Sequence, residues 1–286
     1  MAKDTKKEIH EKRAYPILKS NEMVQHARYG LTLKETKVLA YIFSKVKPGD
    51  KLKQWYVFNM TEYLQVCGMF EGGDNYKNTK KSLQAIRNKS FWMLDKSGKE
   101  TTVGWLEKVE VSKRSGKVAV RLDEDLHKYL IGLKNNYTYY ELLSVLPMRS
   151  VYSVRLYELL KSSAFTKGHT FKREELEYHL DATHYSDNWK DFRRRCLEPA
   201  VEEINAYTDL DVKWEPGNKG RKVIEVHFTI REKDVVEKLI SGNYAHEVLD
   251  GQMSLMDFMN NPSDQEDEWQ DIDDEDEDNT SSLLKK

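Results

Sequence analysis

Cysteine and long apolar runs are scarce in this chain, and each scarcity excludes a class of protein. Only 2 cysteines occur, Cys67 and Cys196, far apart and both on apolar helical positions. Neither a disulfide framework nor a Cys/His zinc site is therefore expected. No apolar run approaches the roughly 20 residues that cross a bilayer, and the charged start, MAKDTKKEIHEKR, has no apolar signal-peptide core. We expect a cytoplasmic protein without metal or membrane association.

Sequence patterns of nucleotide-driven or covalent catalysis are also missing. No GxxxxGK[ST] phosphate loop occurs, and GNKGRK at Gly217 lies between two strand-like runs. No His-hydrophobe-His pair precedes a tyrosine helix, so nicking of the rolling-circle type is not supported. Tyr139 and Tyr140 are interpreted as core or linker residues at the start of an apolar helix, and Asp123 and Asp125 as solvated or helix-starting acids. Neither a catalytic centre nor a cofactor is expected.

The net charge of −2 hides a strong division along the chain. Residues 233–286 carry 4 basic and 16 acidic side chains, whereas residues 1–232 carry 42 and 32. A basic body with an acidic tail suits a nucleic-acid binder that screens its own charge. The run DQEDEWQDIDDEDED is too charged to bury anything and is expected to be disordered. A solvating tail and a DNA-mimicking, autoinhibitory tail both remain open.

A basic helical segment and a basic hairpin follow one another between Asp187 and Ile230. At about 100° per residue, most apolar residues of the helix share one sector. Arg194 lies well off that sector, and Arg193 points nearer to it and has to extend outward. Pro199 is expected to kink or restart the helix. The cations of the segment are Lys190, Arg193, Arg194 and Arg195 in the helix, and Lys219, Arg221 and Lys222 in the hairpin.

This layout is that of a winged helix. A helix fits the major groove of DNA, and a cationic hairpin can contact the flanking phosphates. The turn of the hairpin is expected at the Gly-Asn-Lys that begins at Gly217. A solvated helix that happens to be basic remains the alternative.

The same order of elements occurs twice, which predicts an α+β protein with two tandem winged-helix domains. The first copy begins with a capping box at Thr32 and Glu35 and reaches a basic helix that starts at Tyr76. The second copy mirrors it, with Phe171 in the place of Phe58. A helix and a loop are expected to join the two copies. The expected bounds are a mobile arm at 1–14, domains at 15–135 and 136–232, and a mostly disordered acidic tail at 233–286, with one or two helical turns at its start.

Several runs in residues 15–231 carry a resemblance to a known family. They are SNEMVQHARYGLTLKETKVLAYIFSKVKP, YKNTKKSLQAIRNKSFWM, VRLDEDLHKYL, SVYSVRLYELLKS and DFRRRCLEPAVEEINAYTDLDV. In this order they resemble the landmarks of the iteron-binding plasmid replication initiators. Each run alone is weak, and the specificity comes from their recurrence in register.

The resemblance implies what such a protein does. It implies binding to short direct repeats in double-stranded DNA at a plasmid origin, origin melting, and recruitment of host replication proteins such as the helicase-loading machinery. It also implies a monomer at the repeats in equilibrium with a homodimer, which pairs through its N-terminal domain, represses its own promoter and so takes part in copy control. Two grooves on one face of the DNA predict a site of about 20 base pairs.

The resemblance also implies roles for individual cations. The helix Asp187–Tyr207 would contact bases in one major groove, with candidates Lys190, Arg193, Arg194 and Arg195. The helix Tyr76–Asn88 would lie about one DNA turn away and offer Lys77, Lys80, Lys81 and Arg87, unless that helix is mainly structural. Phosphates would be neutralised by Lys113 and Arg114 in the first domain and by Lys219, Arg221 and Lys222 in the second.

A short motif in the tail departs from the family pattern. The run GQMSLMDF resembles the glutamine-led peptides that bind the bacterial sliding clamp, through Gln252, Met253, Leu255, Met256 and Phe258. In such peptides the glutamine forms hydrogen bonds and the apolar residues fill a pocket. Met256 stands where an aromatic residue is usual. A chance match, or a helix that docks on the body, remains the alternative.

Three functions therefore compete. The first is a replication initiator without a catalytic centre. The second is a transcriptional repressor on the same fold, which a palindromic target would favour. The third is a DNA-processing enzyme such as a relaxase, which ranks last because no set of metal ligands is visible.

Overall fold

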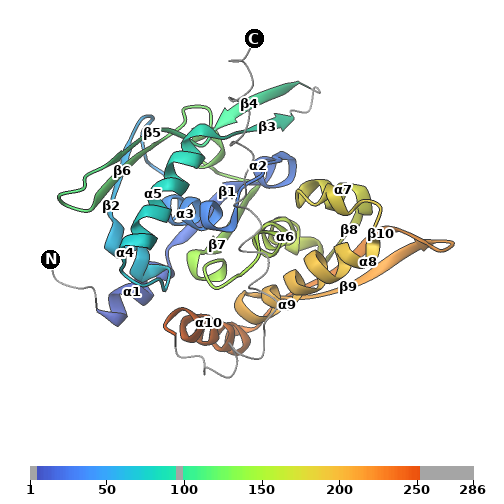
Figure 1. Ribbon diagram of the computed structural model, residues 1–286. Helices are drawn as coiled ribbons and strands as arrows, with labels where there is room; N and C mark the ends of the chain where they lie inside the picture. Colours follow the sequence, from blue (N-terminus) through green and yellow to red (C-terminus); the bar gives the residue numbers. More distant parts are fainter. Residues whose placement is uncertain (1–4, 95–98, 252–286) are drawn as a thin grey trace, which may run out of the picture. The chain divides into compact units, whose positions relative to one another are not determined.

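The computed structural model describes residues 5–94 and 99–251 and contains two winged-helix units (Figure 1). The first unit comprises α3 (Leu33–Phe43), β2 (Trp55–Asn59), α4 (Met60–Val66), α5 (Gly73–Asn88), β3 (Ser90–Leu94), β4 (Glu100–Gly104), β5 (Leu106–Val111) and β6 (Lys117–Leu122). The second unit comprises α6 (Val151–Ser162), β8 (Gly168–Lys172), α7 (Arg173–His179), α8 (Trp189–Phe192), the π-helical η5 (Arg193–Leu197), α9 (Glu198–Tyr207), β9 (Leu210–Lys219) and β10 (Lys222–Glu232).

The two units share one sheet topology. The strand orders are β2-β6-β5 and β8-β10-β9, so the strand after the first helix pairs with the last strand of the hairpin in both units. Phe58 of β2 lies opposite Val118, and Phe171 of β8 lies opposite Val226. All four side chains are buried. The predicted α+β fold with two tandem winged helices is confirmed.

The first unit forms around α3, whose start follows from its sequence. The Thr32 hydroxyl accepts a hydrogen bond from the Glu35 amide at 3.3 Å, and the Glu35 carboxylate accepts one from the Thr32 amide at 2.8 Å. This reciprocal pair satisfies two amides that the helix leaves unbonded. The apolar face then buries Val38, Leu39 and Ile42. The capping box predicted from the sequence is therefore confirmed.

Residues 6–13, which lie in the expected mobile arm, form a helix. Thr5 and Glu8 cap α1 (Lys6–Arg13), and the Arg13 side chain is only 1% exposed. The Arg13 Nε donates to the carbonyl of Val66 at 2.8 Å, and its Nη1 lies 2.7 Å from the Asp250 carboxylate. The expectation was wrong because it used local charge alone, and the carboxylate that compensates Arg13 lies far away in sequence.

The segment between the units contains a strand where a helix and a loop were expected. The strand β7 (Tyr137–Glu141) pairs antiparallel with β1 (Pro16–Ser20), which precedes the helix α2 (Asn21–His26). Tyr140 is buried and Tyr139 is exposed. Neither tyrosine begins an apolar helix, because alternate residues of this segment face opposite sides. A short 3-10 turn at His127–Tyr129 precedes β7, and another at Leu142–Ser144 follows it.

The region after residue 232 is more ordered than expected. The helix α10 (Val235–Leu249) is capped by Asp234 and Glu237, and the Tyr207 and Tyr244 rings stack at 5.5 Å to join it to α9. At its other end, the Leu249 carbonyl lies so close to Gly68 that a Cβ there would come within 2.2 Å. The structure therefore has a full helix where one or two turns were expected. The sequence did not indicate its length, because the buried residues of the helix are small or mixed and form no strongly apolar face. The clamp-like motif at 252–258 lies outside the described residues.

The described residues can be compared with the composition for disulfides, membrane-spanning helices and metal sites. Cys67 and Cys196 are buried and are not joined in a disulfide, which fits small core residues. No helix within residues 5–94 and 99–251 is long and apolar enough to cross a membrane. In the same residues, no group of three or more His, Cys, Asp or Glu side chains is placed to hold a metal ion.

Candidate nucleic-acid interface

The second basic helix consists of α8, η5 and α9 in direct succession. Pro199 has no amide hydrogen to donate to the carbonyl of Arg195, four residues earlier. The chain reaches this position through the π-helical turn η5, whose backbone hydrogen bonds span five residues where those of an α-helix span four. The sequence predicted a kink here but not its form.

The π turn decides how the three arginines are presented. Cys196 and Leu197 are both buried beneath it, while Arg193, Arg194 and Arg195 are all exposed. Arg193 is 46% exposed and lies 3.4 Å from Glu198, so it faces solvent more than the helical wheel suggested. Arg194 is 61% exposed and lies 3.5 Å from Asp191. Such exposed pairs are weak, so the guanidinium groups can exchange them for an anionic partner. Lys190 is exposed one turn earlier.

A buried arginine that the sequence analysis missed orients the start of this helix. Arg173 of α7 pairs with Glu177 at 2.6 Å and donates to the backbone carbonyls of Tyr185 and Ser186. Its guanidinium also lies 5.6 Å from the centre of the Trp189 ring. The segment before α8 is therefore held by a desolvated charge. The only sequence signal is the spacing of Arg173 and Glu177, four residues apart in the charged run KREELE.

The second wing is the hairpin β9–β10. The strands continue through Gly217, and the turn is at Gly220 and Arg221, three residues later than expected. The strand requires glycine at Gly217, because a Cβ there would lie only 2.5 Å from the His227 ring. Gly220 turns the chain at a φ of +63°. The predicted cations Lys219, Arg221 and Lys222 are all exposed at the tip.

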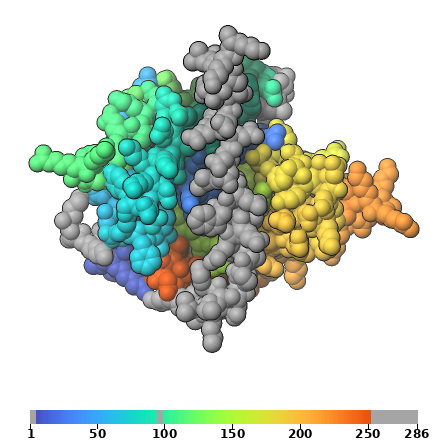
Figure 2. Space-filling view, viewed as in Figure 1, coloured from blue at the N-terminus to red at the C-terminus, as the bar shows by residue number. Residues whose placement is uncertain are grey.

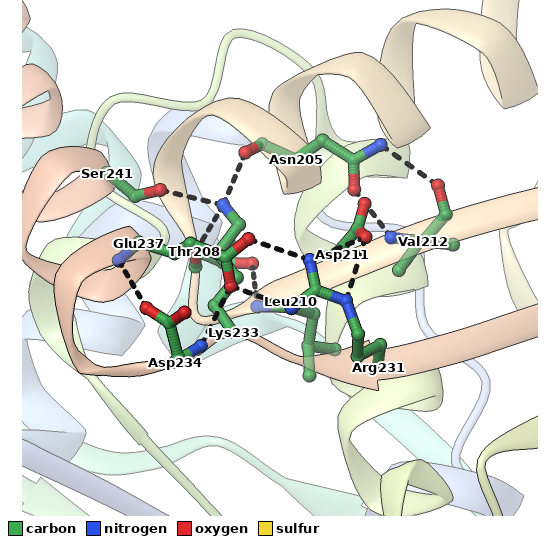
Figure 3. A network of polar contacts seen from close by, with 10 residues as sticks. All are labelled: Asn205, Thr208, Leu210, Asp211, Val212, Arg231, Lys233, Asp234, Glu237 and Ser241. Carbon is green, nitrogen blue, oxygen red and sulfur yellow. Dashed lines mark hydrogen bonds and ion pairs between the residues drawn. The ribbon is translucent and has the colours of Figure 1, made fainter.

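A polar network fixes the base of this wing (Figure 3). The Asn205 side chain of α9 bonds both the amide and the carbonyl of Val212, at 2.7 and 2.9 Å. The Lys233 ammonium donates to the backbone carbonyls of Asn205 and Thr208 and to the Ser241 hydroxyl. Helix α9, the hairpin and α10 are thereby joined at one point, so the tip extends from a rigid base.

Arg231 in the same network differs from the cations at the tip. It contacts Asp211 at 2.8 Å and Glu237 at 2.7 Å. The side-chain hydrogen bond from Arg231 and the Asp234 amide lower the pKa of Glu237 to about 2. A guanidinium held by two carboxylates is neutralised, which makes Arg231 a structural residue of the wing base.

The first basic helix is α5, which begins at Gly73, three residues before the predicted start. Thr79, Leu83 and Ile86 bury one side of it. The predicted cations Lys77, Lys80, Lys81 and Arg87 are all exposed. The nearest carboxylate to Lys77 is that of Asp74, at 3.7 Å, and both side chains are well exposed. The helix therefore buries an apolar side and presents a continuous basic side.

The first wing is the hairpin β5–β6. Its turn carries the exposed cations Lys113 and Arg114 and is closed by Gly116 at a φ of +66°. Figure 2 shows the two wings as projections on opposite sides of the molecule, the first in green and the second in orange. Each unit thus combines one exposed basic helix with one basic wing tip.

Comparison with known proteins places the chain in a family. The family model described as "Initiator Replication protein, WH1" matches residues 16–161, and the model described as "Initiator Rep protein, WH2" matches residues 172–230. A curated Escherichia coli protein described as an uncharacterized 27.6 kDa protein is 23% identical over 229 residues, which cover 73% of this chain and 93% of that protein.

A solved structure of an initiator protein shows the same fold. The crystal structure of the Pi initiator protein in complex with iteron DNA aligns with a TM-score of 0.63 and 20% identity, over 78% of this chain and 99% of that one. Domains 2 and 3 of RctB align with a TM-score of 0.45 and 12% identity, over 71% of this chain and 82% of that one. Both family models match in the order of the two units. The chain therefore belongs to the family of initiator replication proteins.

Proposed function

We propose that this chain initiates plasmid replication by binding directly repeated origin sequences, iterons, in double-stranded DNA. The observation that carries the proposal is that one chain holds two winged-helix units, each with an exposed basic helix and a basic wing tip. Two unequal units in succession have a direction, so they suit a repeat without internal symmetry. The likeness of the fold to the iteron-bound Pi initiator protein supports the same conclusion.

The chemistry of the cations assigns different tasks to the two helices. Arg194 and Arg195 are exposed on the second basic helix, and a guanidinium can bond two guanine acceptors in the major groove. Lys80 and Lys81 on the first basic helix are point charges, which suit phosphates. The wing-tip cations would hold phosphates outside the two grooves. Specificity is therefore proposed to come mainly from the second unit.

Origin opening and recruitment of host proteins are part of the proposal. Within the tail, Gln252, Met253, Leu255, Met256 and Phe258 are proposed to bind the sliding clamp. Changing Gln252 and Leu255 together to Ala should weaken capture of the purified clamp in a pull-down, while Ser254→Ala should not. Absence of capture by the unchanged chain would end this part of the proposal.

The monomer is proposed to act at repeats and the homodimer at the promoter.

The experiment that tests the function is a footprint of the purified chain on the DNA that flanks its own coding sequence. At about 150 mM salt the phosphate contribution is reduced, so protection reports specific binding. We expect several directly repeated protected sites of about 20 base pairs. Protection of a single inverted repeat at the promoter would instead establish a dimeric repressor. Uniform or absent protection would contradict both.

A further inference from the structure

Two buried charges on α6 join the winged-helix units. Arg155 is 6% exposed and Glu158 is 2% exposed, and their side chains lie 3.6 Å apart. A buried charge is costly unless opposite charges and hydrogen bonds compensate it. The partners of these two residues therefore show what the helix must stay attached to. Most of those partners precede α6 in the chain.

Glu158 is bound by three residues from the N-terminal half. The Lys19 ammonium on β1 lies 2.6 Å from one carboxylate oxygen, and the Tyr140 hydroxyl on β7 donates to the same oxygen. The Tyr29 hydroxyl lies 3.5 Å from the other oxygen. Burial raises the pKa of Glu158, but Lys19 and Arg155 outweigh it and hold the pKa below its usual value. Glu158 is therefore a charged centre that fixes two strands and a tyrosine.

Arg155 fixes the segment that follows α2. Its Nη2 donates to the carbonyls of Val24 and Ala27, both at 2.8 Å. Its Nη1 donates to the Tyr29 hydroxyl at 3.3 Å, and its Nε donates to the carbonyl of His179, the last residue of α7, also at 3.3 Å. One guanidinium thus binds the end of α2 and the end of α7 together.

Tyr29 and its neighbour Gly30 extend this attachment into the first unit. The Tyr29 ring packs edge-on against Trp105, with 4.8 Å between ring centres, and lies 5.8 Å from Phe91. The Gly30 carbonyl accepts a hydrogen bond at 3.2 Å from the side chain of Lys89, the residue directly after α5. Tyr29 therefore has its ring in the apolar core of the first unit and its hydroxyl in the charged network of the second.

Arg28 connects the same segment to α7 and to the stretch that leads from α7 to the second basic helix. Its guanidinium lies 3.2 Å from the Asp181 carboxylate and 4.5 Å from the centre of the Tyr178 ring. Asp181 lies between α7 and α8, in the stretch that leads to the basic helix. Residues 28–30 therefore lie between the end of α5 and the approach to α8, and contact both.

We propose that the junction network (Lys19, Tyr29, Tyr140, Arg155 and Glu158) sets the number of base pairs allowed between the two halves of the binding site. The inference rests on the proposed function, because it requires both basic helices to bind one stretch of DNA. It concerns a property that neither helix has alone, namely the selection of a spacing.

The physical reason is the helical geometry of DNA. One turn of about 34–36 Å contains 10–10.5 base pairs, so one inserted pair moves the second half-site by about 3.4 Å and rotates it by about 35°. Units joined by a flexible linker could follow such a change. Units joined through Glu158 cannot follow it without separating buried charges, so simultaneous binding is lost and with it the gain from linkage.

The test is a series of DNA duplexes that carry the footprinted repeat with one or two base pairs inserted or removed between its halves. For the unchanged chain, affinity should fall at least about tenfold per inserted pair, because linkage is lost when the geometry forbids simultaneous binding. Tyr29→Phe and Glu158→Gln should flatten this profile to within about threefold. Both should bind an isolated second half-site as the unchanged chain does. Tyr139→Phe, an exposed tyrosine on the same strand as Tyr140, is the matched control and should keep the steep profile.

Each outcome decides one question. A flat profile for the unchanged chain, or a steep profile for folded Tyr29→Phe, would overturn the spacing role while leaving DNA binding intact. Absence of specific binding by the unchanged chain to any footprinted repeat would overturn the proposed function itself. Tyr29→Phe removes one hydroxyl and keeps the ring, so a cooperative thermal melt of this variant confirms that the fold persists even if Glu158→Gln does not fold.

Discussion

The two winged-helix units share a topology but differ in their cations and in how their wings are anchored. The second basic helix presents three consecutive arginines on a π turn, whereas the α5 helix presents three lysines and one arginine on a regular helix. The second wing is held by Asn205, Lys233 and Arg231, whereas the hairpin β3–β4 separates α5 from the first wing.

This difference indicates a division of labour within one chain. An arginine fork selects guanine by geometry, but a lysine ammonium is attracted by any nearby phosphate. The first wing is anchored as well, by an ion pair at 2.6 Å between Arg121 of β6 and Glu107 of β5, but the hairpin β3–β4 lies between it and its basic helix. We therefore expect the second unit to supply most of the sequence preference and the first unit to supply affinity.

The largest effect is expected from Arg194→Ala combined with Arg195→Ala. Each bidentate contact to a base is worth about 1–3 kcal/mol, so specific affinity should fall by at least about 30-fold. Gel-shift titrations against the repeat and a scrambled duplex would measure the change in preference. Lys51→Ala with Lys53→Ala, in the loop between α3 and β2, is the charge-matched control. Full retention of preference would move base recognition away from the second basic helix.

The next effect is expected at the base of the second wing. Asn205→Ala leaves the amide and carbonyl of Val212 without their side-chain partner, which should reduce the free energy of unfolding by about 1–3 kcal/mol. Denaturant unfolding would measure it, with the exposed Asn243→Ala as the control. An equal loss in both variants would mean that the network does not anchor the wing, and the contrast between the two wings would disappear.

A smaller and different effect is expected from Lys80→Ala combined with Lys81→Ala. Loss of two phosphate contacts should lower affinity for specific and scrambled DNA alike, and reduce the slope of log affinity against log salt by about 2. Binding titrations between about 50 and 200 mM salt would measure both the affinity and this slope. A selective loss on the repeat alone would show that the first unit also discriminates bases.

The smallest effect is expected in how stability depends on pH, and it concerns two histidines. His179 lies beside Arg155 of the junction network, and His246 lies in α10 beside His10 and Arg13. Burial, followed by the nearby charge of Arg155, lowers the pKa of His179 to about 4, and burial with His10 and Arg13 lowers that of His246 to about 4. Both bind a proton more readily when unfolded, at a pKa of about 6.5. Their contribution to stability is therefore complete above about pH 6.5 and is lost as the pH falls towards 4.

Thermal melts between pH 4 and 8 would test this. His246→Gln, in α10, should flatten the pH dependence of the melting temperature. His184→Gln, at an exposed histidine, should not change that dependence. If the melting temperature stays constant between pH 4.5 and 7, neutral histidines do not stabilise the folded unit.

Local pattern predicted much of this molecule, and the reason lies in apolar periodicity. The buried faces of α3 and α5 recur at helical spacing, and β5 and β6 alternate, so burial can be read from neighbouring letters. The exposed cations of both basic helices follow from the same pattern, because they occupy the positions that the apolar residues leave. The π turn did not follow, since Pro199 indicates a disturbance but not its geometry.

Charged residues that find partners far along the chain gave no such signal. Arg13 and Lys19 look solvated in sequence, yet both are buried because Asp250 and Glu158 compensate them. The strand β7 was missed because its partner β1 lies more than a hundred residues earlier, and α10 because its contacts involve Gly68 and Tyr207. Such pairs are defined only by the tertiary fold, so they carry no periodicity.

The contact between Arg13 and Asp250 also has a consequence in time. The two residues are 237 positions apart, and a ribosome adds roughly 5–20 residues per second. Asp250 is therefore synthesised roughly 10–50 s after Arg13. During that interval both winged-helix units can fold, but α1 has no counter-charge from α10. The N-terminal helix, although made first, completes its packing last.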